Sequence, residues 1–437
     1  MLRPATRVPL IRIRWRMFAF LFAFGFIAYF QQKSITVAAG QIMPDLHFSQ
    51  SQIGWLEWAF VSGYALFQLP GGLFGQRVGA RRAFVIIGVL AFAAMVATAI
   101  APTLFQGESV FVALFGAQLV LGVSQAAIFP ISAGVFSAWF PPGRWGFVQG
   151  LQTMGLQLGA AATPPVIAAL MLSLGWQQAL VWTSVPALGV IGWWAWYARN
   201  TPKEHPGIRA AELEEIGDHF GSQTDSNFTL GRLLDVLANR NVLLLFISYT
   251  CMNYVFYLLS NWVFLYLIQE RHFSVLESGG LASAPPLAAA VGAGLGGVFT
   301  NALCPRFGIR WGYRLVPMIA LPAAGLLLIG AVHAGNPYFA VAAIAACYLT
   351  VELTEASFWG SAMTIGGADT MAVTGCMNTG GNLGGIIGIP IIAYLSGEHL
   401  WRVAFLIGAA CAIASALAWL GVAVGKTPGA VAEGESR

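Results

Sequence analysis

Two acidic residues, Glu352 and Glu355, lie within one long apolar stretch of this sequence. A spacing of three places both carboxyl groups on one face of a helix. Two carboxylates so placed repel each other and are costly to desolvate, so one would hold a proton near neutral pH. Such a pair can take up and release a proton as a cavity opens to each side in turn. We favour Glu355, four residues before Trp359; the alternative is a Glu that only accepts a hydrogen bond from a nearby Tyr or Trp.

A basic residue, Lys33, also lies within an apolar stretch. Charged groups in hydrocarbon are costly and tend to face the protein interior or water. Lys33 could therefore anchor an anionic ligand or pair with the two Glu residues. The alternative is that its flexible side chain reaches the interface, because the stretch ends a few residues later.

Polar side chains recur at every fourth position between residues 249 and 261, at Tyr249, Asn253, Tyr257 and Asn261. This spacing makes one continuous helical face. Because two amides fit poorly against lipid, the spacing predicts a cavity wall, with hydrogen bonding between helices as the alternative.

Twelve apolar stretches must position these residues, and each is long enough to cross a bilayer, which takes about 20 residues. Hydrophobic residues make up 57% of the 437 and charged ones 9%, far from the ~25% charged residues of a soluble domain. The sequence therefore predicts an all-α membrane protein. The expected helices are 17–39, 53–75, 83–101, 109–137, 146–170, 176–197, 241–268, 279–303, 313–333, 337–363, 370–395 and 402–424.

The basic residues mark the expected orientation. Nearly all of the 22 Lys and Arg residues fall before the first stretch, in alternate loops or after the last stretch, whereas Arg271 and Arg402 stand alone on the other side. The positive-inside rule then predicts a multi-pass protein of the cell (inner or plasma) membrane with both termini in the cytoplasm. The first stretch is too long for a cleavable signal peptide, so we expect it to remain. Charge spread over short loops does not indicate nucleic acid.

Five cysteines and six histidines are scattered without paired spacing. This pattern predicts neither a disulfide framework, nor a metal site, nor a bound cofactor. The sequence also lacks a nucleotide-binding loop and a Ser/His/Asp arrangement, so we do not expect an enzyme or an ATP-driven pump.

The chain repeats itself at an offset of 225 residues: the glycine pair at 71–72 corresponds to that at 296–297, and the pattern at 157–168 to that at 382–393. Two parallel six-helix repeats are typical of transporters whose halves rock around a central site. We therefore expect two pseudo-symmetric six-helix bundles, residues 1–197 and 241–437. The polar segment 198–240 is the expected cytoplasmic linker.

Several motifs resemble the major facilitator superfamily and, more narrowly, the anion:cation symporter family. Residues 63–72 read GYALFQLPGG and residues 77–82 read RVGARR; further matches are WFPP at 139–142, FW at 358–359 and MNTGGN at 377–382. The resemblance covers nearly the whole chain. It implies the major facilitator fold, a central cavity lined by the first, fourth, seventh and tenth helices, and transport of an organic anion such as a sugar acid.

The departures from the family pattern concern its charges. The family carries an Asp-Arg pair in the first helix where this sequence has Gln31 and Gln32, and an Arg and a Glu in the fourth helix where it has Gln118 and Gln125. The loop Asp is replaced by Gln76. Glutamine can donate and accept hydrogen bonds but cannot carry a proton. The family's proton route therefore cannot be assumed.

The sequence thus predicts a secondary transporter of a small organic solute, with Glu355 and Glu352 coupling protons. An uncoupled facilitator of a neutral or zwitterionic solute, and a membrane sensor that does not transport, stay open as alternatives. The expected partners are the solute, the lipid bilayer and, where coupling operates, protons; we expect a monomer. The expected substrate-binding residues are Lys33, Asn253 and Tyr257, together with the cavity positions that the resemblance implies: Tyr29, Gln32, Tyr64, Gln118, Gln125, Trp359 and Asn378. The resemblance assigns conformational roles to Gly72, Arg77, Gly79, Arg81 and Arg82.

Overall fold

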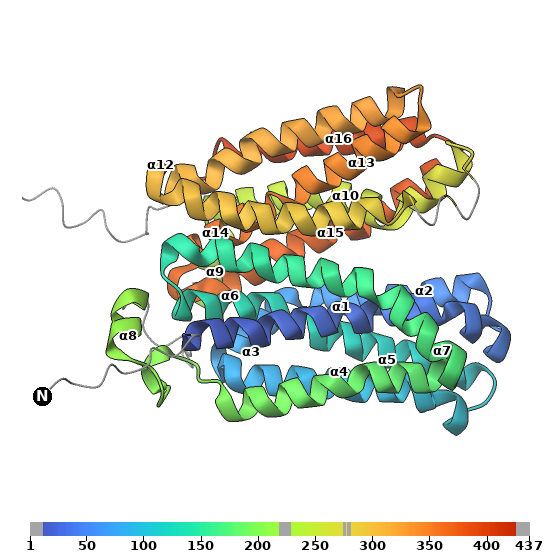
Figure 1. Cartoon of the computed structure of the whole chain (residues 1–437), viewed down its shortest axis with the longest axis horizontal. Coiled ribbons are helices and arrows are strands. Elements are labelled where there is room, and N and C mark those ends of the chain that lie inside the picture. Colours follow the sequence, from blue (N-terminus) through green and yellow to red (C-terminus); the bar gives the residue numbers. More distant parts are fainter. Residues whose placement is uncertain (1–11, 218–228, 274–276, 278–280, 425–437) are drawn as a thin grey trace, which may run out of the picture.

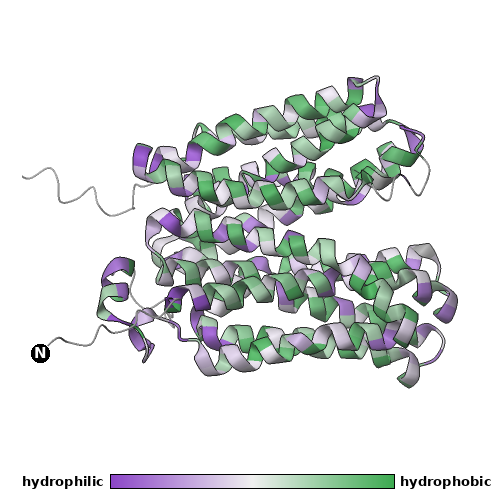
Figure 2. Ribbon diagram, viewed as in Figure 1, coloured by the Kyte–Doolittle hydropathy of each residue, from purple (hydrophilic) through white to green (hydrophobic). Residues whose placement is uncertain are grey.

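The computed structural model describes residues 12–217, 229–273, 277 and 281–424. Within them the chain is helical, with no strand. Figure 1 shows two groups of long helices side by side, the first half of the chain in one and the second half in the other. Hydrophobic residues cover the lengths of the helices and hydrophilic residues gather toward their ends (Figure 2). This is the distribution expected of a protein whose surrounding solvent is lipid.

The first half contains α1 (Ile13–Leu46), α2 (Gln50–Leu66), α3 (Gln68–Val78), α4 (Ala80–Leu104), α5 (Glu108–Ala126), α6 (Ile128–Trp139) and α7 (Trp145–Tyr197). The second half contains α10 (Arg240–Gln269), α12 (Ala284–His333), α13 (Pro337–Glu352), α14 (Glu355–Gly366), α15 (Thr370–Gly397) and α16 (Trp401–Trp419). Two short helices, α8 (Ala210–Ile216) and α9 (Leu230–Ala238), lie between the halves in sequence.

The prediction of twelve crossings is confirmed for the described residues. The long helices α7 and α12 each contain a glycine with positive φ, Gly175 (78°) and Gly308 (77°), where the chain turns back. Only glycine adopts this conformation readily, so each helix makes two crossings. Three other crossings, expected to be continuous, are broken: α2–α3 at Phe67, α5–α6 at Ala127 and α13–α14 after Glu352. The first helix is also longer than the predicted 17–39.

Glycines allow the two halves to approach closely along two seams. A Cβ added at Gly150 of α7 would lie 2.7 Å from the carbonyl oxygen of Ala293 in α12. A Cβ added at Gly72 of α3 would lie 2.3 Å from the carbonyl oxygen of Met371 in α15. Both distances are too short for a real side chain, so these seams depend on glycine.

The start of α1 is held by α8. The Glu212 carboxylate accepts hydrogen bonds from the backbone amides of Ile13 (3.3 Å) and Arg14 (3.1 Å), which the helix itself leaves unpaired. Arg14 also donates to Glu215 at 2.6 Å. That hydrogen bond holds the pKa of Glu215 below its usual value. Its contribution to folding is therefore present at neutral pH and is lost as the pH falls through this lowered pKa.

We expect Glu212→Gln to lower the melting temperature. A neutral amide is a weaker acceptor at a helix N-terminus, and the loss of such a cap costs about 1 kcal/mol. In a chain of this size we expect a decrease of about 1–3 °C. Thermal unfolding in detergent would measure it, with the exposed neighbour Glu214→Gln as the control. Equal melting temperatures for the two variants would contradict the capping role.

Candidate functional site

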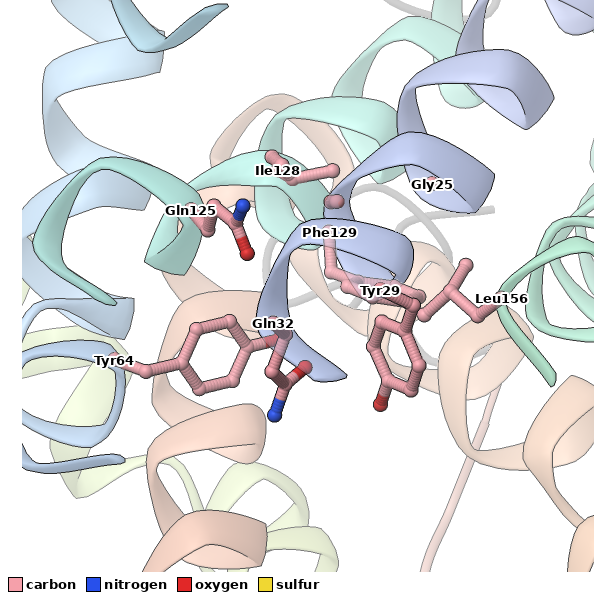
Figure 3. Close-up of a pocket in the computed structure, with 9 residues that line it drawn as sticks. Gly25, Tyr29, Gln32, Tyr64, Gln125, Ile128, Phe129 and Leu156 are labelled. Carbon is pink, nitrogen blue, oxygen red and sulfur yellow. The ribbon is translucent and has the colours of Figure 1, made fainter. Parts of the chain in front are cut away.

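A small hollow lies within the first half, between α1, α2, α5, α6 and α7 (Figure 3). Four predicted site residues line it: Tyr29 and Gln32 from α1, Tyr64 from α2 and Gln125 from α5. Figure 3 shows Tyr64, Gln32 and Tyr29 next to one another in this hollow. The other lining residues are Gly25, Ala28, Ile128, Phe129 and Leu156. Phenols and amides over an apolar floor are the kinds of group that line small-molecule sites, and in this conformation the hollow has room for about one water molecule.

The glutamines at the expected charged positions have different environments. Gln125 donates to the side-chain oxygen of Gln31 at 2.9 Å, joining α5 to α1 beside the hollow. Gln118 does not join this pair; its amide donates to the hydroxyl of Thr98 in α4 at 3.1 Å. Gln118 is therefore a contact between helices of the first half.

Glu355 is buried at the start of α14, and both of its oxygens are hydrogen-bonded. The Tyr249 hydroxyl lies 3.1 Å from each oxygen, and the Trp359 indole donates to Oε2 at 2.8 Å. Trp359 in turn stacks on Phe129 of the first half, with ring centroids 5.3 Å apart. Two donors, with the Tyr249 hydroxyl shared between the oxygens, satisfy a buried carboxylate well. Trp359 thus lies in the seam between the halves rather than in the hollow.

Glu352 ends α13 and has a poorer set of partners. It is 1% exposed, and among the described residues its Oε2 atom has no hydrogen-bond partner. The side chain of Gln157, from α7 in the other half, faces its carboxyl group, and Tyr29 of the hollow is within electrostatic reach. An acceptor buried without a donor is costly. A proton on this carboxyl group, or a hydrogen-bond donor of a bound substrate, would satisfy the Oε2 atom.

The polar face of α10 packs mainly on α15. Tyr257 donates to Asn382 at 3.1 Å, and the Asn253 amide donates to the Tyr249 carbonyl oxygen of its own helix at 2.9 Å. Asn261 lies on the exposed part of the helix. These contacts favour the alternative of hydrogen bonding between helices, although Tyr257 is also within electrostatic reach of Tyr29.

Asn378 joins the halves rather than lining the hollow. Its amide donates to the Gln68 side-chain oxygen at 2.7 Å, so α15 is tied to α3. The nitrogen of Gln68 is buried without a partner among the described residues. Gln68 was missed from the sequence, although it stands inside a membrane-crossing motif and is 0% exposed.

Lys33 has an acidic neighbour that sequence reasoning missed. Glu57 of α2 is within electrostatic reach of its ammonium group and accepts a hydrogen bond from Thr36 at 2.8 Å. Glu57 lies within the predicted 53–75 stretch, so its position was the available signal. The structure places Lys33 with Glu57, one helical turn from Tyr29, and does not pair it with Glu352 or Glu355.

The halves are also tied at the end of the molecule that carries the start of α1 and the loop after α3, which we call the terminal end. Here Gln76 of α3 donates to Asp369 Oδ1 at 2.9 Å and to the Ala368 carbonyl oxygen at 3.2 Å. Arg232 of α9 forms an ion pair with Asp369 at 2.7 Å. We call Gln76, Arg232 and Asp369 the Asp369 clasp. It joins both halves and the linker, and a carboxylate at position 76 would repel Asp369.

The expected conformational residues divide into two groups. Gly72 and Arg77 lie on α3, and Gly72 faces Met371 across the seam. The others, Gly79, Arg81 and Arg82, follow α3 in the loop to α4 and in the first turn of α4.

Within that loop, Gly79 has φ of 86°. Arg81 donates from its side chain to the Ala195 carbonyl oxygen at 3.0 Å and from its backbone to Asn200 at 2.9 Å. Arg82 is exposed. Gly79 and Arg81 therefore attach the loop to the end of α7, while Gly72 and Gln76 contact the other half.

Comparisons with known proteins agree with this architecture. The probable sulfoacetate transporter SauU of Cupriavidus necator is 27% identical over 373 residues, covering 85% of this chain and 84% of that protein. The D-galactonate transporter of Escherichia coli O6:H1 is 25% identical and the hexuronate transporter of Bacillus subtilis 24%, each alignment covering at least 94% of both chains. These three are similar to this chain along most of its length.

Solved structures show the same fold. The transporter FucP, in the outward conformation, superposes with a TM-score of 0.73 at 13% identity, covering 95% of this chain and all of that one. The proton:xylose symporter XylE gives a TM-score of 0.74 at 13% identity, covering 94% and 96%. Residues 21–372 match the sequence model of the Major Facilitator Superfamily. The resemblance read from the motifs is thus confirmed, and the chain belongs to the Major Facilitator Superfamily.

Proposed function

We propose that this protein is a secondary transporter that moves a small organic anion across a bilayer by alternating access. The observation that carries the proposal is the junction of the halves. Glu352 of one half faces Gln157 of the other and is within electrostatic reach of Tyr29, which lines a hollow of amides and phenols. A polar, ionisable site between two helical bundles is where such transporters bind their solutes. The named substrates of the relatives, sulfoacetate, D-galactonate and hexuronate, support an anion.

The terminal end is proposed to face the cytoplasm of a cell whose inner membrane holds the protein. Its basic loops support this orientation. The bundles, residues 1–197 and 241–437, would rock about the site as a monomer, with 198–240 as the linker. The Gly72 seam and the Asp369 clasp close the terminal end in this conformation, so the solute would enter from the opposite side.

Protons are proposed to be the coupling ion, with Glu352 as the carrier. Glu355 already accepts hydrogen bonds from two donors, the Tyr249 hydroxyl and the Trp359 indole, whereas Glu352 keeps one oxygen without a donor. A carboxyl group whose partners are incomplete is the better candidate to gain and lose a proton. This reverses the preference for Glu355 that the sequence suggested.

The direct test is solute-driven proton movement in proteoliposomes. We would add sulfoacetate, sugar acids, aromatic carboxylates, amino acids and neutral sugars in turn and record the external pH. Alkalinisation with an anion would support proton-coupled anion transport. Tracer uptake of an anion without any pH change would indicate an uncoupled facilitator. Thermal stabilisation by a compound that shows no flux would indicate a sensor and contradict transport.

We expect Lys33→Gln to weaken the binding of an anionic substrate. Lys33 follows Gln32 of the hollow and lies one helical turn from Tyr29, and a charge-assisted hydrogen bond lost there would raise KM by about tenfold. Uptake measured over a range of solute concentrations would check this, with Lys33→Arg as the charge-retaining control. An unchanged KM in Lys33→Gln would show that Lys33 does not bind the anion.

A further inference from the structure

Helix α9 has three distinct sides. Leu230, Leu234 and Leu237 are 72%, 56% and 41% exposed, and a helical rotation of 100° per residue places them on one face. Among the described residues between α7 and α10, these leucines are the large apolar side chains that are exposed. A row of exposed leucines outside the membrane-crossing helices indicates an interaction surface.

The other two sides of α9 have different environments. Val236 is 8% exposed and Arg232 forms the ion pair with Asp369, so this side faces the protein. Asp235 and Gly231 are exposed and lie roughly 120° from the middle of the leucine row. The helix therefore touches protein on one side, presents leucines on a second and a polar surface on the third. Such a division fits a helix placed where protein, lipid and water meet.

We propose that α9 is an interfacial helix whose leucine row, Leu230, Leu234 and Leu237, inserts into the boundary between lipid headgroups and acyl chains. The occupant is lipid because α9 leads directly into a membrane-crossing helix whose first turns expose apolar side chains. Only Asn239 separates α9 from α10, which exposes Leu243 (51%) and Ile247 (46%) within its first turns.

The charges beside the leucine row also suit a membrane surface. Arg240 is exposed at the junction of α9 and α10. A cation placed there can reach lipid phosphates while the leucines lie below it. Because Arg232 is on the same helix, seating α9 in the membrane also fixes the position of the Asp369 clasp. The bilayer thereby supports the contact between the two halves at the terminal end.

The test compares spin labels at positions 234 and 235 of the full chain in nanodiscs of mixed zwitterionic and anionic lipids. Cys251 and Cys411, the part-exposed cysteines, are first replaced by alanine. Collision rates are measured with oxygen, which concentrates in lipid, and with a neutral nickel chelate, which stays in water. A label at Leu234→Cys should collide several-fold more with oxygen relative to nickel than one at Asp235→Cys.

Two results would overturn the proposal. Equal access of nickel to both labels would place the leucine row in water. A label at 234 that neither reagent reaches would mean that protein, from this chain or another, covers the row. If Leu234→Cys does not yield folded protein, Leu237→Cys on the same face gives the same comparison.

Discussion

Replacing Glu352 by glutamine should abolish accumulation driven by a proton gradient while leaving exchange of solute across the membrane intact. The substitution keeps the size and hydrogen-bonding capacity of the side chain and removes only its ability to carry a proton. For one proton per solute, a pH difference of one unit is worth about 1.4 kcal/mol, or about tenfold accumulation. We expect the unaltered protein to reach that ratio and Glu352→Gln to stop at equal concentrations.

The measurement is tracer uptake into proteoliposomes with the membrane potential clamped at zero, together with counterflow in the absence of a pH gradient. Glu270→Gln, at an exposed position just after α10, is the matched control and should accumulate normally. Glu355→Gln should instead lose stability, because Tyr249 and Trp359 would then share a neutral acceptor. Normal accumulation by Glu352→Gln, with loss of accumulation in a stable Glu355→Gln, would return the carrier role to Glu355.

Local sequence signals were sufficient to predict the membrane-crossing helices and the two-fold repeat. Hydrophobicity over about 20 residues is a property of each segment alone, so a crossing can be predicted without knowing which helices pack against it. The breaks at Phe67 and Ala127 each fall three residues before a proline, Pro70 and Pro130, which has no N–H to bond the carbonyl oxygen four residues earlier. That local signal was present in the sequence and was not used. The break after Glu352 has no proline or glycine near it and depends on how the helix packs against the others.

The site was harder to predict because it depends on contacts between distant segments. Gln118 and Gln125 share a face of an ideal helix, but seven residues separate them by about 10 Å along its axis. Over that distance the helix packed against this face of α5 changes: Gln125 meets α1, whereas Gln118 meets α4 and donates a hydrogen bond to Thr98. Likewise, the partnership of Gln76 with Asp369 joins residues almost 300 positions apart. Nothing local to either residue indicates it.

Adding one methyl group at Gly72 should prevent the halves from closing at the terminal end. The Cβ of Gly72→Ala would lie 2.3 Å from the carbonyl oxygen of Met371, a backbone atom that cannot turn aside. Relief requires the two halves to separate, and overpacking of this kind costs about 1–3 kcal/mol. A cost of that size shifts the balance between two conformations about 5–150-fold. Transport should fall accordingly, because the closed terminal end is one of the states of the cycle.

Spin-label distances across the terminal end would reveal the shift directly. Labels at Arg82 and Arg310, both exposed and in opposite halves, should move apart in Gly72→Ala. Gly116→Ala is the matched control, because a Cβ at Gly116 of α5 meets nothing within 4 Å, and its distances and uptake should not change. If Gly72→Ala melts at the normal temperature yet gives the Gly116→Ala distances and uptake, this seam does not govern closure. The Asp369 clasp, which joins the same two halves through hydrogen bonds and an ion pair, would then have to hold the terminal end shut.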